Sequence, residues 1–230
     1  MDPLEILIAD KTHRALLADY LLHFFKDFEP ITQSLHLDYN EAKAFFDDLV
    51  DESLRDPVSF VVFSEKRELI ACRLNTICEF DTTSGNFINK FQPNTNAYSL
   101  KALKILNFLD QLFDFDIRKW LDEFIVFDNK QENDHVVKLL KFVTVSVRAD
   151  YQRKGIAKIL IDKSVNLGRT MGCRAVLVTA TASKSQNLFE KMGFRVIREV
   201  EHERFVDETE GRIFNCEDGT FCGKLMFKIM

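Results

Sequence analysis

Apolar residues in the first quarter of the chain recur with two periods, one typical of strands and one of helices. Residues 5–9 form a short, branched, weakly alternating run that predicts a first strand. Apolar side chains then recur at spacings of three and four, which predicts a helix capped by Thr12. Pro30 cannot continue this helix, and it biases Glu29 toward an extended backbone. The apolar helix positions are Leu16, Leu17, Tyr20, Leu21, Phe24, Phe25 and Phe28.

The same pattern predicts two more helices and a pair of strands before residue 114. Residues 39–54 are amphipathic, and residues 100–113 place leucines on one helical face. The run SFVVFSEKRELIACRLNTICEF, residues 59–80, predicts two strands around a polar turn at 64–67. Residues 82–95 are polar and predict a loop.

In the second half of the chain, strands and helices interleave. Residues 141–147 and 174–180 predict strands, with a helix over 154–167 between them. A short helix over 185–191 follows, and residues 220–230 suit a final strand. This order predicts a mixed α/β sheet with a βαβ crossover at its centre. Since no repeat or low-complexity linker interrupts the chain, residues 1–230 are expected to form a single domain.

Composition narrows the classes of function. The net charge of −5 disfavours a nucleic-acid partner, and no apolar run is long enough to cross a membrane. The acidic N-terminal sequence does not resemble a signal peptide, and five cysteines without a CxxC pair predict a reduced, cytoplasmic protein. The five histidines do not cluster at metal-ligand spacing, so no metal is expected. The 22 phenylalanines fit either an aromatic core or an aromatic-lined pocket.

A basic turn with one glycine lies between the strand 141–147 and the helix that follows. Backbone N–H groups at such a helix start are unpaired and favour an anion, although a solvated basic helix start is the simpler alternative. The chain has neither GxxxxGK[ST] nor GxGxxG, which excludes a P-loop nucleotide site and a dinucleotide fold. The turn consists of Gln152, Arg153, Lys154, Gly155, Ile156 and Ala157.

This turn resembles the coenzyme A signature (Q/R-x-x-G-x-G/A) of the GCN5-related N-acetyltransferases. The downstream stretch TASKSQNLFEKMGF, residues 181–194, is similar to the other signature of that family, a strand followed by a helix ending L-Y-E-K-x-G-F. The resemblance implies a mostly antiparallel mixed sheet flanked by helices, with the strands at 141–147 and 174–180 splayed apart. It also implies that acetyl-CoA binds at residues 152–157 and that its pantetheine arm bonds the backbone near Val145 and Val147.

The segment FFKDFEPIT, residues 24–32, resembles the F-F-x-[DE]-E-P-[LI] segment of insect-type arylalkylamine N-acetyltransferases, including dopamine acetyltransferases. The resemblance implies that Glu29 is the catalytic base, although Phe28 stands where that family usually has an acid and Asp27 lies one place earlier. The chemistry agrees, because an ammonium must lose a proton before it attacks a thioester. The alternative for Glu29 is a solvent-facing residue at a helix end.

The general acid is less defined. The tyrosine of the family helix is replaced by Phe189, which cannot donate a proton but is expected to contact the cofactor. Ser185, where the insect-type enzymes also carry a serine, is the candidate donor to sulfur; a plain first-turn helix residue is the alternative. Ser183 fits the N-cap. A cysteine nucleophile is disfavoured because no cysteine has a histidine near it in the sequence.

The function expected from these residues is acetyl transfer from acetyl-CoA to a small primary amine, with an arylalkylamine as the leading acceptor. Phe24, Phe25 and Phe28 would line the amine site, although helical periodicity also places some of them in the core. A protein or polyamine acetyltransferase and a non-catalytic acyl-CoA sensor are the alternatives. The protein is expected to be a monomer or a weak dimer.

Overall fold

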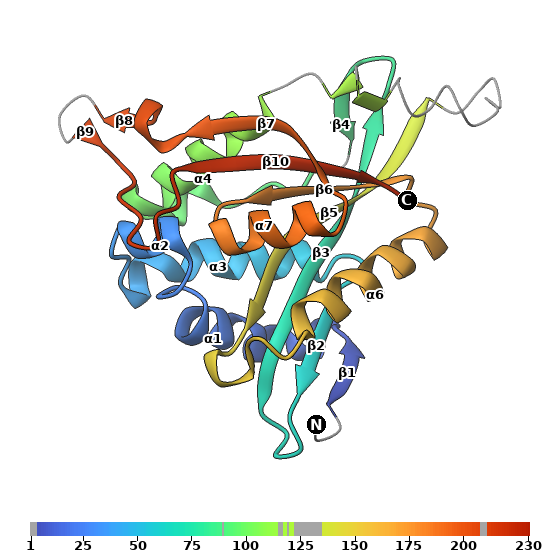
Figure 1. Ribbon diagram of the computed structural model, residues 1–230, viewed down its shortest axis with the longest axis horizontal. Coiled ribbons are helices and arrows are strands. Elements are labelled where there is room, and N and C mark those ends of the chain that lie inside the picture. The colour runs from blue at the N-terminus through green and yellow to red at the C-terminus, as the bar shows by residue number, and fades with distance from the viewer. Residues whose placement is uncertain (1–3, 89, 115–116, 119, 122–134, 208–210) are drawn as a thin grey trace.

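A twisted sheet crosses the protein, and helices cover both of its faces (Figure 1). The structure is a computed structural model, and the residues that it describes are 4–88, 90–114, 117–118, 120–121, 135–207 and 211–230.

The described part of the first half of the chain contributes four α-helices, two short 3-10 helices and one edge of the sheet. Its elements are β1 (Glu5–Ile8), η1 (Lys11–His13), α1 (Arg14–Phe24), α2 (Pro30–Ser34), α3 (Tyr39–Ser53), β2 (Phe60–Phe63), β3 (Leu69–Asp81), β4 (Asn86–Ile88), η2 (Thr95–Ala97) and α4 (Leu100–Phe113). α1 ends at Phe24, before Pro30 is reached, and Pro30 instead begins α2, because a proline there lacks only an N–H that a helix start leaves unpaired.

The second half contributes the centre and the other edge of the sheet. Its elements are β5 (Val136–Val147), η3 (Ala149–Tyr151), α6 (Ile156–Thr170), β6 (Ala175–Ala180), α7 (Ser183–Lys191), β7 (Arg195–Glu201), η4 (His202–Arg204), β8 (Val206–Asp207), β9 (Gly211–Arg212) and β10 (Cys222–Ile229).

The strands of the main sheet follow the order β1-β2-β3-β5-β6-β10-β7, and β4 pairs with β3. Every pair is antiparallel except β5 with β6, which α6 connects as a βαβ crossover. The predicted mixed, mostly antiparallel sheet is confirmed.

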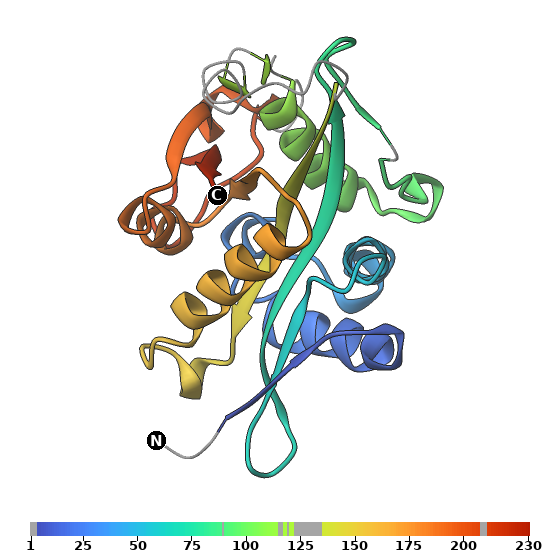
Figure 2. The same ribbon diagram turned by 90° about the vertical axis from the view of Figure 1, so that its right-hand side faces the viewer.

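Each face of the sheet buries its own apolar core. In Figure 2, α1 and α3 lie on one side of β3 and β5, and α6 lies on the other. The first core contains residues of α1, α3 and α4, while the second joins α6 and α7 to the sheet. Phenylalanines fill much of both; in the first, the rings of Phe205 and Phe214 stack with centroids 5.4 Å apart. No described helix is long and apolar enough to cross a bilayer.

Several local predictions were wrong. Asp10, not Thr12, is the cap at the first helix, because its carboxylate accepts the Thr12 N–H at 2.8 Å. The predicted loop 82–95 contains β4, which pairs back onto β3 as a hairpin. The edge strand β7 was missed, since its alternating charges hide the apolar positions. The strand predicted from residue 141 begins five residues earlier, at Val136.

Candidate active site

The central strands β5 and β6 separate before either of them ends. Their parallel pairing stops at Phe142 opposite Val178, while β5 continues to Val147. The register of β5 against β3 jumps from Phe142 to Thr144, so Val143 is an extra, bulged residue. A β-bulge bends its strand and increases the local twist. The predicted splay is therefore present, and the bulge explains why β5 turns away from β6.

The backbone of β5 offers hydrogen-bonding groups to this gap. The N–H of Arg148 donates to the Ile70 carbonyl at 2.8 Å, on the β3 side. Because successive strand residues alternate in direction, Val147 and Val145 point their N–H and C=O groups toward the gap. The side-chain amide of Gln152 donates to the Val147 carbonyl at 3.0 Å. A pantetheine arm would find donors and acceptors here, and would compete with Gln152 for one of them.

The turn after β5 presents an uncapped helix start. Gly155 is the N-cap of α6, with φ 79°, and no side chain caps the helix. The first helical bond runs from the Ile159 N–H to the Gly155 carbonyl, so the N–H groups of the preceding turn have no partner within the helix. Arg153 also adopts a left-handed conformation, with φ 59°. The turn can thus accept an anion without displacing a side chain of the protein.

Space and charge at this turn also fit a diphosphate. A Cβ atom at Gly155 would meet nothing within 4 Å, so the surface above the turn is open. Lys154 lies exposed with its ammonium 4.6 Å from the centre of the Tyr151 ring. Positive charge, free N–H groups and access therefore coincide where the sequence predicted the cofactor.

Glu29 lies buried on the other face of the sheet, at the start of α2. It is 8% exposed, and its extended backbone makes it the N-cap of that helix. One carboxylate oxygen accepts the N–H of Thr32 at 2.8 Å and also its hydroxyl. The other accepts the hydroxyl of Thr181 at 2.7 Å. The solvent-facing alternative for Glu29 is thereby excluded.

Burial raises the pKa of Glu29 above that of an ordinary glutamate, against the opposing effect of the hydrogen bonds from Thr32 and Thr181. A carboxylate with a raised pKa holds a proton more firmly, which suits a group that must accept one. Sequence analysis missed Thr181, which follows β6 directly. A polar residue at the end of a buried strand is the signal that would have found it.

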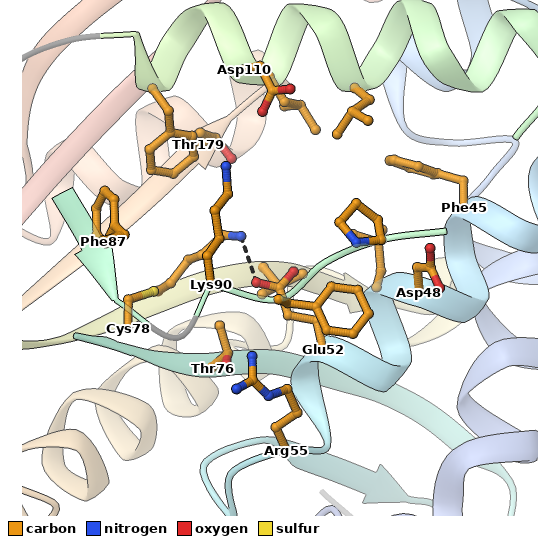
Figure 3. Close-up of a pocket in the computed structure, with 18 of the residues that line it drawn as sticks. Phe45, Asp48, Glu52, Arg55, Thr76, Cys78, Phe87, Lys90, Asp110 and Thr179 are labelled. Atoms are coloured by element: carbon orange, nitrogen blue, oxygen red, sulfur yellow. Dashed lines mark hydrogen bonds and ion pairs between the residues drawn. The ribbon is translucent and has the colours of Figure 1, made fainter. Parts of the chain in front are cut away.

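A cavity of about 250 Å³ lies on the same face of the sheet, between α3, α4 and β3 (Figure 3). Aromatic rings line much of it, together with three carboxylates and three cations. One carboxylate, Glu52, pairs with Lys141 at 2.8 Å, and another, Asp48, accepts the Tyr98 hydroxyl at 2.7 Å. The charged lining residues are Asp48, Glu52, Asp110, Arg55, Lys90 and Lys141. Asp48, on α3, faces this cavity.

The cavity reaches the gap between the central strands. Val143 and Thr179, which lie just beyond the last β5–β6 pair, both line it. Thr181 is two residues beyond Thr179 and so lies about 7 Å along the chain at a strand rise of about 3.3 Å per residue. Because alternate strand residues share a face, the Thr181–Glu29 hydrogen bond lies on the same side of the sheet as the cavity.

The three phenylalanines predicted to line an amine site lie outside this cavity. Phe24 and Phe28 are 40% and 66% exposed, and Phe25 packs edge-on against Phe46 in the core. None of these three lines the cavity, because α1 ends at Phe24 and the following turn directs the rings elsewhere. The rings that line the cavity come from four other segments of the chain: Phe45, Phe87, Phe91, Tyr98 and Phe113.

Helix α7 follows the gap on the α6 side. Ser185 donates its hydroxyl to the Ala182 carbonyl at 2.8 Å, as a first-turn helix residue does. Phe189 is 1% exposed, and its ring packs 5.0 Å from that of Phe194. Packing therefore accounts for Phe189 in this structure, and its contact with the cofactor stays a prediction.

The start of α7 is capped from outside the helix. Ala182 is the N-cap, so the prediction that Ser183 takes this role was wrong. The N–H of Ser183 donates to the Thr220 hydroxyl oxygen at 2.9 Å, and that hydroxyl donates to Asp218 at 2.9 Å. Thr220 thus fixes the end of the loop that follows β6.

Replacing Thr220 by valine should lower the free energy of unfolding by about 1 kcal/mol, because the Ser183 N–H loses its acceptor. Urea denaturation measures this change. Thr170→Val is the matched control, since its hydroxyl bonds only the exposed end of α6. Equal stability of the two variants would contradict the capping role.

The fold brings Cys216 and His202 together, a pairing that their sequence separation did not indicate. The Cys216 sulfur lies 3.7 Å from Nδ1 of His202. Burial raises the pKa of the Cys216 thiol to about 12 and lowers that of the His202 imidazole to about 4. Both groups are therefore neutral near pH 7, and the pair does not form a thiolate and imidazolium. All five cysteines are free, and no described residues form a His, Cys, Asp or Glu cluster for a metal.

Known proteins match this architecture. Residues 123–194 match the model of the acetyltransferase (GNAT) family. A Drosophila melanogaster polyamine N-acetyltransferase that forms N-acetylagmatine has a TM-score of 0.75 and 16% identity, over 99% of this chain and 100% of that one. Arylalkylamine N-acetyltransferase 2 of Aedes aegypti has a TM-score of 0.68 and 21% identity, over 99% of each chain.

A more distant similarity is to NAA60 of Arabidopsis thaliana, solved in complex with acetyl-CoA, with a TM-score of 0.56 and 13% identity over 99% of each chain. No curated protein sequence matches the chain. Its sheet and its splayed central strands are those of the GNAT fold, residues 123–194 match the family model, and the chain is similar in fold to insect arylalkylamine and agmatine N-acetyltransferases.

Proposed function

We propose that this protein transfers the acetyl group of acetyl-CoA to the primary amine of a small molecule, with Glu29 as the general base. The observation that carries the proposal is the buried Glu29 carboxylate, tied to Thr181 beside the gap between the central strands. The uncapped start of α6 supports the cofactor side, because its free N–H groups suit a diphosphate.

The chemistry follows from these positions. In a ternary complex, the amine nitrogen gives its proton to Glu29 and attacks the carbonyl carbon of the thioester. The C–N bond forms and the C–S bond breaks, with its electron pair leaving on sulfur. A backbone N–H of β5 that points into the gap beside the thioester would stabilise the oxyanion. Ser185 remains the candidate to hydrogen-bond sulfur, once its hydroxyl turns away from the Ala182 carbonyl.

The cavity supports a small acceptor. Its aromatic lining favours an aryl group, which makes an arylalkylamine the leading class. Asp48 and Asp110 also line it and would pair with a second positive charge on the acceptor, such as that of a polyamine, in competition with Arg55 and Lys90 of the same lining. Both acceptor classes therefore belong in the test.

The purified protein should release thiol from acetyl-CoA when a small primary amine is present. A panel of arylalkylamines, polyamines and amino-terminal peptides, assayed by thiol release, identifies the acceptor class. Turnover with peptides alone would favour a protein acetyltransferase. Binding of coenzyme A without thiol release for any amine would replace the enzymatic proposal by that of an acyl-CoA sensor.

A further inference from the structure

Arg73, in the middle of β3, is a buried cation, and two of its guanidinium nitrogens have no hydrogen-bond partner. Its side chain is 1% exposed, and neither Nε nor Nη2 has a hydrogen-bond partner. The ionisable group that interacts with the Arg73 charge is the Cys72 thiol, and burial raises the pKa of that thiol to about 12. Because that thiol is neutral near pH 7, it does not balance the positive charge of Arg73.

The guanidinium lies at the closed end of the gap. Its central carbon is 3.6 Å from the centre of the Phe142 ring, and Phe142 is the last residue of β5 that pairs with β6. Across the sheet, Arg73 is opposite Val145, whose backbone points into the gap. The ring of Phe142 belongs to the core beneath α6 and α7. The positive charge therefore sits where the two central strands part.

Burying an unpaired positive charge lowers the stability of the fold. A buried charge is normally paired, and replacing an unpaired one with an apolar side chain of similar volume tends to stabilise a protein. The ring of Phe142 offers partial compensation through its π face. Burial lowers the pKa of the guanidinium, but arginine remains protonated near pH 7 because its ordinary pKa is so high. An anionic ligand would supply the negative charge that the protein does not place beside this guanidinium.

The length of the strand indicates which part of acyl-CoA reaches this point. Val147 and Phe142 lie opposite Ala71 and Asn75 of β3, which are four residues apart because Val143 is bulged, and this corresponds to about 13 Å at a strand rise of about 3.3 Å per residue. An extended pantetheine arm spans roughly 15 Å from diphosphate to sulfur at standard bond lengths. With the diphosphate on the turn before α6, sulfur would therefore lie near the level of Phe142 and Arg73.

We propose that Arg73 stabilises the negative charge on the coenzyme A sulfur as the C–S bond breaks. This inference rests on the proposed function and assigns a role to a side chain that the acid–base chemistry leaves unused. The electron pair of the broken bond stays on sulfur as a thiolate beside the guanidinium. The proton of the amine goes to Glu29, so Arg73 neither gains nor loses one.

The first test measures the ionisation of free coenzyme A bound to the protein. Ultraviolet absorbance of the thiolate, followed against pH, should give a bound-thiol pKa lower by about one to two units than in solution, as expected for a charge at about 5 Å. Arg73→Met should return it to the solution value, and Arg73→Lys should retain part of the shift. Arg169→Met, which removes an exposed arginine from α6, should leave it unchanged.

The second test combines stability with turnover. Arg73→Met should unfold at the same or a higher temperature than the wild type while kcat falls about tenfold to a hundredfold, in line with the shift in thiol pKa. A less stable variant with an unaltered bound-thiol pKa would assign Arg73 a structural role and overturn the inference. The wild-type titration needs no variant, and an unshifted bound thiol would overturn it as well.

These outcomes are distinct from failure of the proposed function. If the wild type binds no coenzyme A, or releases no thiol with any amine, the function itself is wrong. If the wild type turns over and Arg73→Met does so equally well with the same bound-thiol pKa, only the role of Arg73 is wrong.

Discussion

Replacing Glu29 by glutamine should lower kcat/KM near pH 7 by about 10²- to 10⁴-fold, the usual contribution of a general base. Glutamine keeps the size of the side chain and an oxygen that can accept from Thr181 or Thr32. It cannot accept a proton from the amine. Steady-state thiol release across a range of pH values measures the effect.

The pH profile separates loss of the base from loss of structure. The variant should recover as pH rises toward the pKa of the amine, because the free amine then forms without help. In the wild type, activity should rise with pH through the raised pKa of Glu29 and then level off. Asp27→Asn, an exposed neighbour that pairs with Lys26, is the matched control and should behave like the wild type. A loss in Glu29→Gln that does not change with pH would refute the role of base.

The stability of the same variant provides a further check. Burial raises the pKa of Glu29, so ionisation of Glu29 opposes folding, and the stability it contributes is lost as pH rises through its folded pKa. Glu29→Gln should therefore unfold at an equal or higher temperature near pH 8. A variant that is both less stable and inactive would indicate a purely structural carboxylate.

Replacing Gly155 by valine should weaken coenzyme A binding by at least about a hundredfold. The glycine has φ 79°, a conformation that β-branched residues adopt only with strain. The new side chain would also project into the open space where a diphosphate would approach, although no protein atom lies there to clash with it. Isothermal titration with coenzyme A measures the loss.

Gly172→Val separates these two effects. Gly172 has φ 81° and equally open space, but it follows the opposite end of α6. Both variants should lose about 1–2 kcal/mol of stability from the strained backbone, while only Gly155→Val should lose affinity. Equal affinities in the two variants would place the diphosphate elsewhere.

The sequence indicated most of this fold, because its strongest signals are local. The helix over 100–113 appears with those bounds, and the crossover strands and helix differ from expectation by only a few residues, except at the start of β5. The hairpin strand β4 was missed because a three-residue strand carries almost no periodicity and depends on its partner β3.

The candidate site divides in the same way. The turn 152–157 is contiguous, so the sequence could single it out as a candidate anion site, and the resemblance to a family signature favoured that interpretation over a solvated helix start. The cavity combines α3, β3 and α4, and nothing in any one of these segments shows that Asp48 and Asp110 face the same space. Arg73 illustrates the limit most clearly. In the sequence it is one polar residue in a strand, and only the packed sheet shows that two of its guanidinium nitrogens have no hydrogen-bond partner.

The bulge at Val143 has a consequence for how this site could arise or be lost. The opening between β5 and β6 depends on one surplus residue of main chain rather than on any functional group. A chain shortened by that residue would keep every acid, hydroxyl and ring named above. We expect that β5 and β6 would then continue to pair beyond Phe142 and Val178, and that a thioester could not bind between them. A substitution scan that replaces side chains one by one would pass over this feature, whereas a single-codon deletion would reveal it.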